Sequence, residues 1–123
     1  MPLVDVAIVL RPQESLPPTL ARELADRIGE VLDSSPGSTW VTVRAIPADQ
    51  FAENHAESAM EVRPVFVTIL KSKLPLPEVL QREVSALTPA IARVCGRPEQ
   101  HVHIIYQPDG TGRVAFGGAL VTG

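Results

Sequence analysis

The sequence is short of cysteine and of basic charge, and each shortage excludes a class of protein. Cys95 is the only cysteine among 123 residues, which excludes an internal disulfide and a CxxC metal or redox pair. We interpret it as a small buried side chain. The 11 basic residues do not outnumber the 14 acidic ones, and a net charge of -3 provides no basic stripe for a phosphate backbone. Nucleic acid is therefore not an expected partner.

Long apolar runs are also missing. The longest, 62–70 and 3–10, are interrupted or far shorter than the roughly 20 residues that cross a bilayer, so no membrane span is predicted. The first residues show neither a positively charged start nor a small-residue cleavage site, and we expect a cytoplasmic protein. Hydrophobic residues make up 45% and charged residues 20%, as in an ordinary globular domain.

What is present is a hydrophobic pattern that predicts a strand, a helix and a strand in the first half. β-branched residues mark a strand over 3–10, and alternation with period two marks another over 40–46, before Pro47. Between them lies a predicted helix with Ser15 as a possible N-cap and prolines in its first turn. Apolar residues recur at helical spacing at Leu20, Leu24, Ile28 and Val31.

The second half repeats this order. Strands are predicted over 65–70 and 101–106, and between them a helix that Gly96 can end in the left-handed conformation. Pro89 lies inside this helix and is expected to bend it or loosen one turn. The helical spacing is set by Leu80, Val84, Leu87, Ile91 and Val94.

We interpret the chain as one domain of two β-α-β repeats, about 2–47 and 64–107, with a C-terminal arm or hairpin over 108–123. Prolines recur at an offset of 62 residues, at Pro2 and Pro64 and at Pro36 and Pro98. The predicted fold class is α/β (α+β), a four-stranded sheet with both helices on one face. The polar segment 48–61 is either a short turn or a binding loop.

A sheet with helices on one face leaves the other face uncovered. Side chains alternate along a strand, so the apolar residues of the strands cannot all lie under two helices. A neighbouring subunit would cover the rest, and the sequence therefore predicts an oligomer. The strand residues that cannot all pack under the two helices are Leu3, Ala7, Val9, Trp40, Thr42, Ile69 and Ile105.

Pro2 is the residue most suited to chemistry. If Met1 is removed, Pro2 becomes a secondary amine at the first position of a strand. A free α-amino group titrates near 8, and both burial and nearby cations disfavour its charged form. The result would be a base or an acid that works at neutral pH.

The order of these features resembles the tautomerase superfamily. The resemblance rests on a proline directly after Met1, the first strand, the duplicated β-α-β unit and the Gly-Gly arm. The second half, 64–121, is similar over its whole length to one 4-oxalocrotonate tautomerase subunit, especially at 80–85 (LQREVS) and 116–120 (FGGAL). The full chain thus looks like a fused-subunit member of the superfamily.

The resemblance implies a cofactor-independent tautomerase or isomerase acting on a small 2-hydroxy- or 2-oxo-carboxylic acid. It also implies a homotrimer whose sheets line an inner barrel, with Pro2 as the catalytic amine at a subunit boundary. Pro64 matches Pro2 in the second repeat, but its nitrogen lies within the chain as an amide. One catalytic site per chain is therefore expected.

The substrate-binding candidates follow from the same resemblance. Where the family's short enzymes place an arginine in the closing strand, this chain has Trp40 and His103. Arg44, on the same strand face as Trp40, is the nearest cation for a carboxylate, helped by Arg11 or Lys73 from an adjacent subunit. Apolar walls would come from Trp40 and from Phe116, the latter with a register shift from Val114.

Simpler roles stay open for these side chains. His103 can equally be a hydrogen-bonded interior or interface residue, and Trp40 can be interface filler. Solvated surface charge is the alternative for Arg11, Lys71 and Lys73. His103 and His101 lack a third ligand, so no metal site is predicted.

Two rival functions also stay open. One keeps the fold but uses protonated Pro2 as the acid of a hydrolytic dehalogenase or decarboxylase of a small three-carbon acid, with Glu53 or Asp109 as loose candidates to activate water. The other is a non-catalytic trimeric binding or scaffold protein, an alternative that the missing family arginine in the closing strand keeps open.

Overall fold

The structure is a computed structural model that describes residues 2–55 and 62–123. Four strands form one mixed sheet in the order β2-β1-β3-β4. β1 pairs parallel with β2 and antiparallel with β3, and β3 pairs parallel with β4. The strands are β1 (Leu3–Val9), β2 (Trp40–Ile46), β3 (Val65–Leu70) and β4 (Val102–Tyr106).

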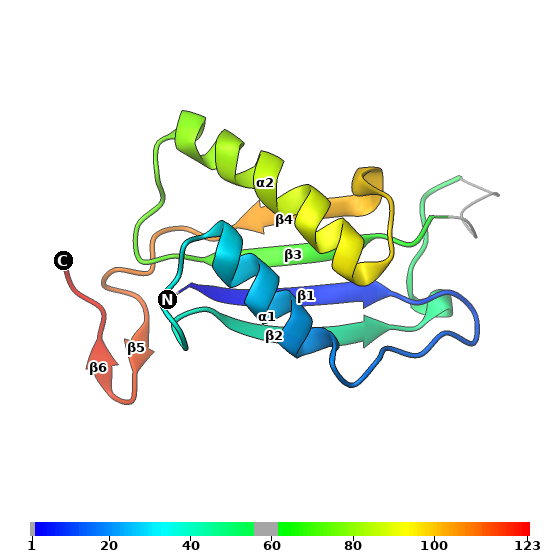
Figure 1. The fold of residues 1–123 in the computed structure, drawn as a ribbon, viewed down its shortest axis with the longest axis horizontal. Coiled ribbons are helices and arrows are strands. Elements are labelled where there is room, and N and C mark those ends of the chain that lie inside the picture. Colours follow the sequence, from blue (N-terminus) through cyan, green and yellow to red (C-terminus); the bar gives the residue numbers. More distant parts are fainter. Residues whose placement is uncertain (1, 56–61) are drawn as a thin grey trace.

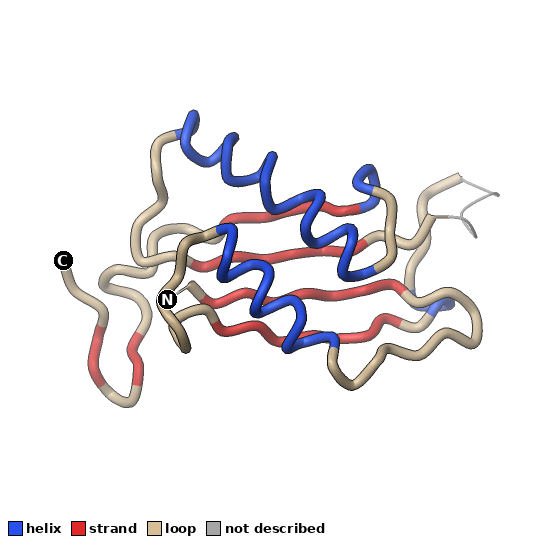
Figure 2. The backbone as a smooth tube through the Cα atoms, viewed as in Figure 1, coloured by secondary structure: helices blue, strands red, loops and turns tan. Residues whose placement is uncertain are grey.

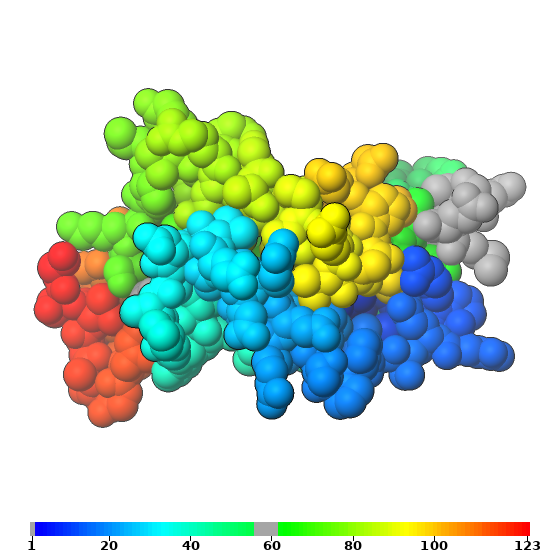
Figure 3. Space-filling model, in the orientation of Figure 1, coloured from blue at the N-terminus to red at the C-terminus, as the bar shows by residue number. Residues whose placement is uncertain are grey.

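Both helices, α1 (Leu20–Val31) and α2 (Pro77–Cys95), lie on the same face of this sheet (Figures 1 and 2). In the space-filling view from that side, the two helices hide most of the strands (Figure 3). The predicted fold class, with its two β-α-β crossovers, is therefore confirmed. Within the described ranges, no helix is both long and apolar enough to cross a membrane.

The start of α1 differs from the prediction. Thr19, not Ser15, occupies the N-cap position, and Pro17 and Pro18 lie before the helix rather than in its first turn. The Thr19 hydroxyl donates to Glu23 at 3.2 Å, and the Leu20 N–H donates to the Pro17 carbonyl. The prolines lack N–H groups and favour an extended entry, so the helix begins only after both have passed.

α2 continues through Pro89 to Cys95. Gly96 then ends it as predicted, with φ of 65° in the left-handed region. The Arg97 N–H closes the last turn on the Ala92 carbonyl at 3.0 Å. A residue with a Cβ would be strained at Gly96, so this glycine fixes where the chain leaves the helix for β4.

β4 begins one residue later than predicted, because His101 belongs to a short 3-10 turn, Glu99–His101, that precedes the strand. His101 and His103 therefore do not share one strand, and among the described residues no three His, Cys, Asp or Glu side chains gather to hold a metal ion.

The hydrophobic core lies between the sheet and the two helices. Its buried members come from alternate positions of the strands and from one face of each helix: Val4, Val6, Ile8, Leu20, Leu24, Ile28, Val65, Val67, Ile69, Leu87, Ile91, Ala92 and Val102. Ile69 is fully buried in this core. On β3 it shares the parity of Val65 and Val67, and it is Phe66 and Thr68 that point the other way.

The face without helices, called the open face here, is only partly covered within one chain. Trp40 and Ile105 are 57% and 56% exposed on it. Phe51, from the segment after β2, lies across part of this face with its ring 6.2 Å from that of Phe66. The described part of the predicted 48–61 segment is thus a turn, Ala48–Gln50, followed by this contact, and its remainder lies outside the described residues.

The C-terminal arm forms the predicted hairpin. β5 (Ala115–Phe116) and β6 (Ala119–Leu120) pair antiparallel across Gly117 and Gly118, whose φ angles of 57° and 90° suit glycine. The hairpin lies beyond the end of the sheet where β1 starts (Figure 1). There the Phe116 ring meets Trp40 edge-on, with centroids 5.7 Å apart.

Candidate active site

Pro2 lies buried just before β1, one of the two central strands. Its carbonyl accepts the Trp40 N–H at 3.1 Å, which ties it to the start of β2. A hollow of about 450 Å³, called the Pro2 hollow here, opens beside it. The hollow is lined by Pro2, Leu32, Asp33, Ser34, Ser35, Ser38, Lys71, Ser72 and Lys73.

Strand direction brings these distant segments together. β1 and β3 are antiparallel with Leu3 opposite Leu70, so the residues after β3 reach the start of β1. β2 starts beside β1 with Trp40 opposite Leu3, so the turn that leads from α1 into β2 reaches the same place. The lysines and the serines therefore meet at Pro2 although they are far apart in the sequence.

The positive charge of the hollow comes from two lysines, of which, in the described part of the chain, one is paired with a carboxylate and the other is not. Lys71 donates to Glu83 Oε1 at 2.5 Å, and the other oxygen of Glu83 accepts the Tyr106 hydroxyl at 2.5 Å. The Lys71 and Glu83 side chains are only 18% and 12% exposed. Burial and the bond to Glu83 raise the pKa of Tyr106, so its hydroxyl stays a proton donor. Lys73 makes no ion pair within the described residues, and its ammonium is the one available to an anion.

A second, apolar hollow of about 360 Å³ lies on the open face beside the start of β1. Trp40 stands in its wall and Phe116 packs against Trp40, so these two predicted wall residues are in contact with each other. The hollow is lined by Leu3, Val4, Asp5, Trp40, Thr42, Thr68, Leu70 and Gln107, and Pro2 is not among them.

Arg44 points onto the open face and is paired with Asp5. Its Nη2 and Nε lie 3.0 and 3.2 Å from Asp5 Oδ2, and Thr42 donates to Oδ1. The hydrogen bond from Arg44 is the main reason that the pKa of Asp5 is lowered. Arg44 lies opposite Ala7, five residues along β1 from Pro2, or roughly 16 Å by the strand rise.

His103 and Arg11 are also away from the Pro2 hollow of their own chain. His103 lies beside Phe66 on the open face, with ring centroids 6.0 Å apart. Arg11 follows the far end of β1, where it pairs with Glu14 at 3.3 Å and donates to the Gly96 carbonyl. The length of β1, roughly 23 Å, separates it from Pro2. One chain thus unites Pro2 with Lys73 alone among the predicted carboxylate-binding cations.

Several residues in and beside the Pro2 hollow are not identified by the sequence. The serines of the turn between α1 and β2 carry no functional pattern, yet Ser34, Ser35 and Ser38 line the hollow. Glu83 and Tyr106 carried no local signal, because their link to Lys71 forms only when α2, β4 and the segment after β3 come together. Lys73 was expected at the site from the resemblance, and it does line the Pro2 hollow.

No protein-family model and no curated protein match the sequence. Several solved structures, however, match the fold of the chain. The Q0 fused 4-OT, a wild-type symmetric trimer, has a TM-score of 0.74 at 15% identity, over 97% of this chain and 94% of that one. Macrophage migration inhibitory factor from Oncomelania hupensis has a TM-score of 0.72 at 16% identity, over 98% of this chain and 81% of that one. FG41 malonate semialdehyde decarboxylase, inhibited by 3-bromopropiolate, has a TM-score of 0.67 at 19% identity, over 95% and 92%.

The chain therefore has the fold of the tautomerase superfamily, and the resemblance found in the sequence is confirmed for the fold. At these identities the likeness shows architecture alone. This chain is similar in length to the fused 4-OT chains, because its match to the F6 fused 4-OT, an asymmetric trimer, covers 94% of each chain.

Proposed function

We propose that the protein is a cofactor-independent tautomerase or isomerase that uses Pro2 as general base and acid on a small 2-hydroxy- or 2-oxo-carboxylic acid. The observation that carries this proposal is the position of Pro2, buried at the start of a central strand in a hollow that presents Lys73 to an anion. The proposal requires removal of Met1, which turns the Pro2 nitrogen from an amide into a secondary amine.

The reaction needs only proton movement. Neutral Pro2 would take a proton from an enol hydroxyl or an acidic carbon of the substrate, and the electron pair would spread over the conjugated system. The Pro2 ammonium would then return the proton to a different carbon. Lys73 would bind the substrate carboxylate or the oxygen on which charge develops, which is the kind of fixed electrostatic stabilisation that lowers such barriers most.

We further propose a homotrimer. Its support is the exposure of Trp40 and Ile105 on the open face and the trimeric state of the fused 4-OT chains of the same fold. Arg44, Arg11 and His103 would act on the substrate only if another copy brings them to the Pro2 hollow, because their own chain does not. Trp40 and Phe116 would be walls of the site by the same route.

A second candidate is the use of protonated Pro2 as an acid in hydrolytic dehalogenation or decarboxylation. Asp33 lines the Pro2 hollow, and a carboxylate near an amine favours the charged form. A malonate semialdehyde decarboxylase also shares the fold. The two residues predicted to activate water do not support this second candidate. Asp109 accepts the Leu74 N–H at 2.7 Å, which anchors a loop, and Glu53 does not line the hollow.

The test compares the native N-terminus with one that is blocked. Intact mass first shows whether Met1 is removed. Ketonisation of a 2-hydroxydienoate or of phenylenolpyruvate is then followed by absorbance for the wild type and for a variant with one added residue before Pro2. Loss of the amine is expected to lower kcat/KM by about 10²–10⁴-fold. Equal rates in the two proteins would refute the proposal, and no turnover by either would favour a binding or scaffold protein.

Two further measurements assign the roles. A Lys73→Ala variant is expected to raise KM about tenfold or more, whereas Arg22→Ala, on the exposed surface of α1, serves as the matched control and should leave KM unchanged. NMR titration of the Pro2 nitrogen separates the candidates: a pKa below 7 supports the base role, and a pKa above 7 together with carbon dioxide or halide release supports the acid role.

A further inference from the structure

The other end of the sheet is the counterpart of the Pro2 end, with Pro64 of the second repeat in the place of Pro2. Pro64 is fully buried directly before β3, as Pro2 is before β1. Because β1 and β3 are antiparallel, equivalent positions of the two repeats lie at opposite ends of the sheet. The Pro64 end is formed by the segment after β1 and the turn after α2.

Residues 62 positions apart are equivalent in the two repeats, and several equivalent pairs differ between the two ends of the sheet. Lys73 of the Pro2 hollow corresponds to Arg11 at the Pro64 end, and Ser35 corresponds to Arg97. Glu14 has Leu76 as its counterpart, and the Leu76 side chain is exposed at 69%. The Pro64 end therefore has a buried arginine and a carboxylate where the Pro2 end has a serine and an apolar side chain in solvent.

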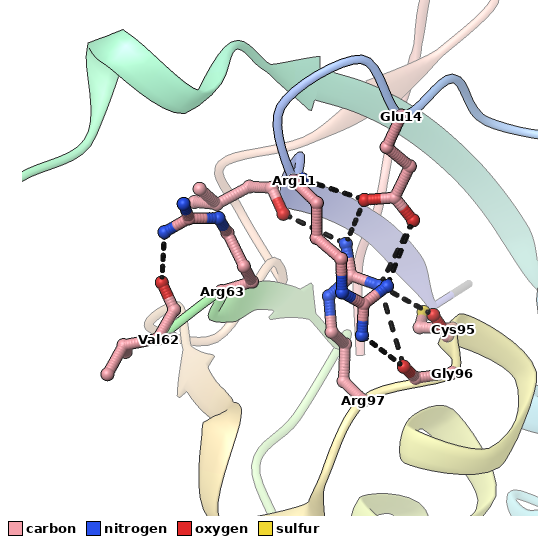
Figure 4. A network of polar contacts seen from close by, with 8 residues as sticks. Arg11, Glu14, Val62, Arg63, Cys95, Gly96 and Arg97 are labelled. Atoms are coloured by element: carbon pink, nitrogen blue, oxygen red, sulfur yellow. Dashed lines mark hydrogen bonds and ion pairs between the residues drawn. The ribbon is translucent and has the colours of Figure 1, made fainter. Parts of the chain in front are cut away.

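The Glu14 carboxylate at this end is bound as a small carboxylate ligand would be (Figure 4). Its Oε1 accepts Arg97 Nη2 at 2.7 Å and the Arg11 backbone N–H at 2.8 Å. Its Oε2 accepts Arg97 Nη1 at 3.2 Å and Arg11 Nη1 at 3.3 Å. Each oxygen thus has two donors, and the Arg97 guanidinium presents the two-pronged geometry that fits a carboxylate.

Arg97 is held in place by contacts other than Glu14. Its Nη2 donates to the Val9 carbonyl at 2.9 Å and its Nη1 to the Cys95 carbonyl at 3.2 Å. The Arg97 side chain is only 1% exposed and that of Glu14 is 24% exposed. The guanidinium therefore forms the floor of the site and the carboxylate its mouth, open to solvent. The buried Nε of Arg97 has no hydrogen-bond partner among the described residues.

We propose that the Pro64 end is a second carboxylate-binding site, preformed around Arg97, whose occupant is the Glu14 side chain of the same chain. Removing that side chain opens the site to a small free monocarboxylate such as acetate or formate. The Pro2 end has no tethered carboxylate at the equivalent position, so its hollow stays open to a free one. This proposal concerns binding at the Pro64 end and holds whether or not Pro2 is catalytic.

The test uses the full chain with a Glu14→Ala substitution and sodium acetate as the probe, with sodium chloride at equal ionic strength as the reference. The unfolding temperature of the variant is expected to rise with acetate concentration until it levels off. The rise should be roughly 4–8 °C at an acetate concentration about tenfold above the Kd for acetate. The wild type has its Pro64 end filled, so any response of its unfolding temperature to acetate comes from the Pro2 hollow and should be smaller than that of the variant. Isothermal titration with acetate should give one more site in the variant than in the wild type.

Glu30→Ala is the matched control, because Glu30 is an exposed carboxylate paired with Arg27 at 3.6 Å on the surface of α1. An unfolding temperature of E14A that is the same in acetate and chloride would overturn the proposal, and so would an equal acetate response of E30A. If E14A does not fold in chloride, refolding yield in acetate becomes the measurement. Recovery of folded protein in acetate supports the site, and failure in both salts overturns it.

Discussion

Glu83 joins the Pro2 hollow to the helix layer, and its neutralisation gives the sharpest test of the site's electrostatics. It binds Lys71 with one oxygen and Tyr106 with the other, each at 2.5 Å. A Glu83→Gln substitution keeps the shape of the side chain but removes its charge. The Lys71 ammonium then loses its buried counter-charge at the edge of the hollow.

The magnitude follows from the burial of this pair. Removing one partner of a fully buried ion pair costs about 3–5 kcal/mol. Here Lys71 is 18% exposed and can turn partly toward water, and the amide of glutamine keeps some of the hydrogen bonding. We expect E83Q to lower the free energy of unfolding by about 2 kcal/mol, and the melting temperature by roughly 6–12 °C for a domain of this size.

Urea unfolding followed by circular dichroism measures the change, with two controls. Tyr106→Phe loses one hydrogen bond and should cost about 1 kcal/mol. Glu78→Gln, in the exposed first turn of α2, should change stability by less than about 0.5 kcal/mol. A stability of E83Q within about 0.5 kcal/mol of the wild type would refute the reasoning.

The same variant reports on the hollow. The uncompensated Lys71 charge should lower the pKa of the Pro2 amine, because a nearby cation disfavours its protonated form. NMR titration of Pro2 in E83Q and the wild type measures this shift. An unchanged pKa in a destabilised protein would show that Glu83 supports the fold but does not set the charge that Pro2 experiences.

Three further predictions follow. Burial raises the pKa of the Cys95 thiol to about 11, so iodoacetamide at pH 8 should label the folded protein about 100-fold more slowly than the unfolded one, as mass spectrometry can follow. Gly96→Ala should cost about 1 kcal/mol because of its left-handed φ, whereas Gly29→Ala inside α1, with open space around it, should stabilise the helix; urea unfolding compares the two. The pKa values of Asp5 and Glu14 are lowered from 3.8 and 4.5, so their stabilisation is complete above those ordinary values and is lost as pH falls through the lower folded ones; a pH series of melting temperatures that stays flat below pH 4.5 would contradict this.

The strands were predictable because local residue patterns mark where they begin and end. Alternation over 40–46 and the proline that follows fix β2 to the residue. The orientation of β3 was harder, because Phe66 and Leu70 are as apolar as Val65 and Ile69. With apolar residues at both parities, alternation cannot tell which set faces the helices, and only the structure shows that Val65, Val67 and Ile69 do.

The site was predictable only where one residue carries the signal. Pro2 stands out by position alone, and Lys73 was a candidate only through the resemblance to the tautomerase superfamily. The contacts of Lys71 with Glu83 and Tyr106 form only when three elements pack together. The ion pair of Arg97 with Glu14 joins two loops that are 83 residues apart in the sequence. No local pattern encodes such meetings.

The placement of the sole tryptophan gives the molecule an optical probe of its own. Trp40 donates its indole N–H to the Gly37 carbonyl at 3.0 Å and meets Phe116 edge-on, yet more than half of its surface faces solvent. Because no other tryptophan contributes, the colour and polarisation of the intrinsic emission come from one known spot at the rim of the sheet. Release of the hairpin would expose Trp40 further and shift its emission to longer wavelength. Binding of another copy over Trp40 would shift the emission to shorter wavelength, so both events can be followed without a label.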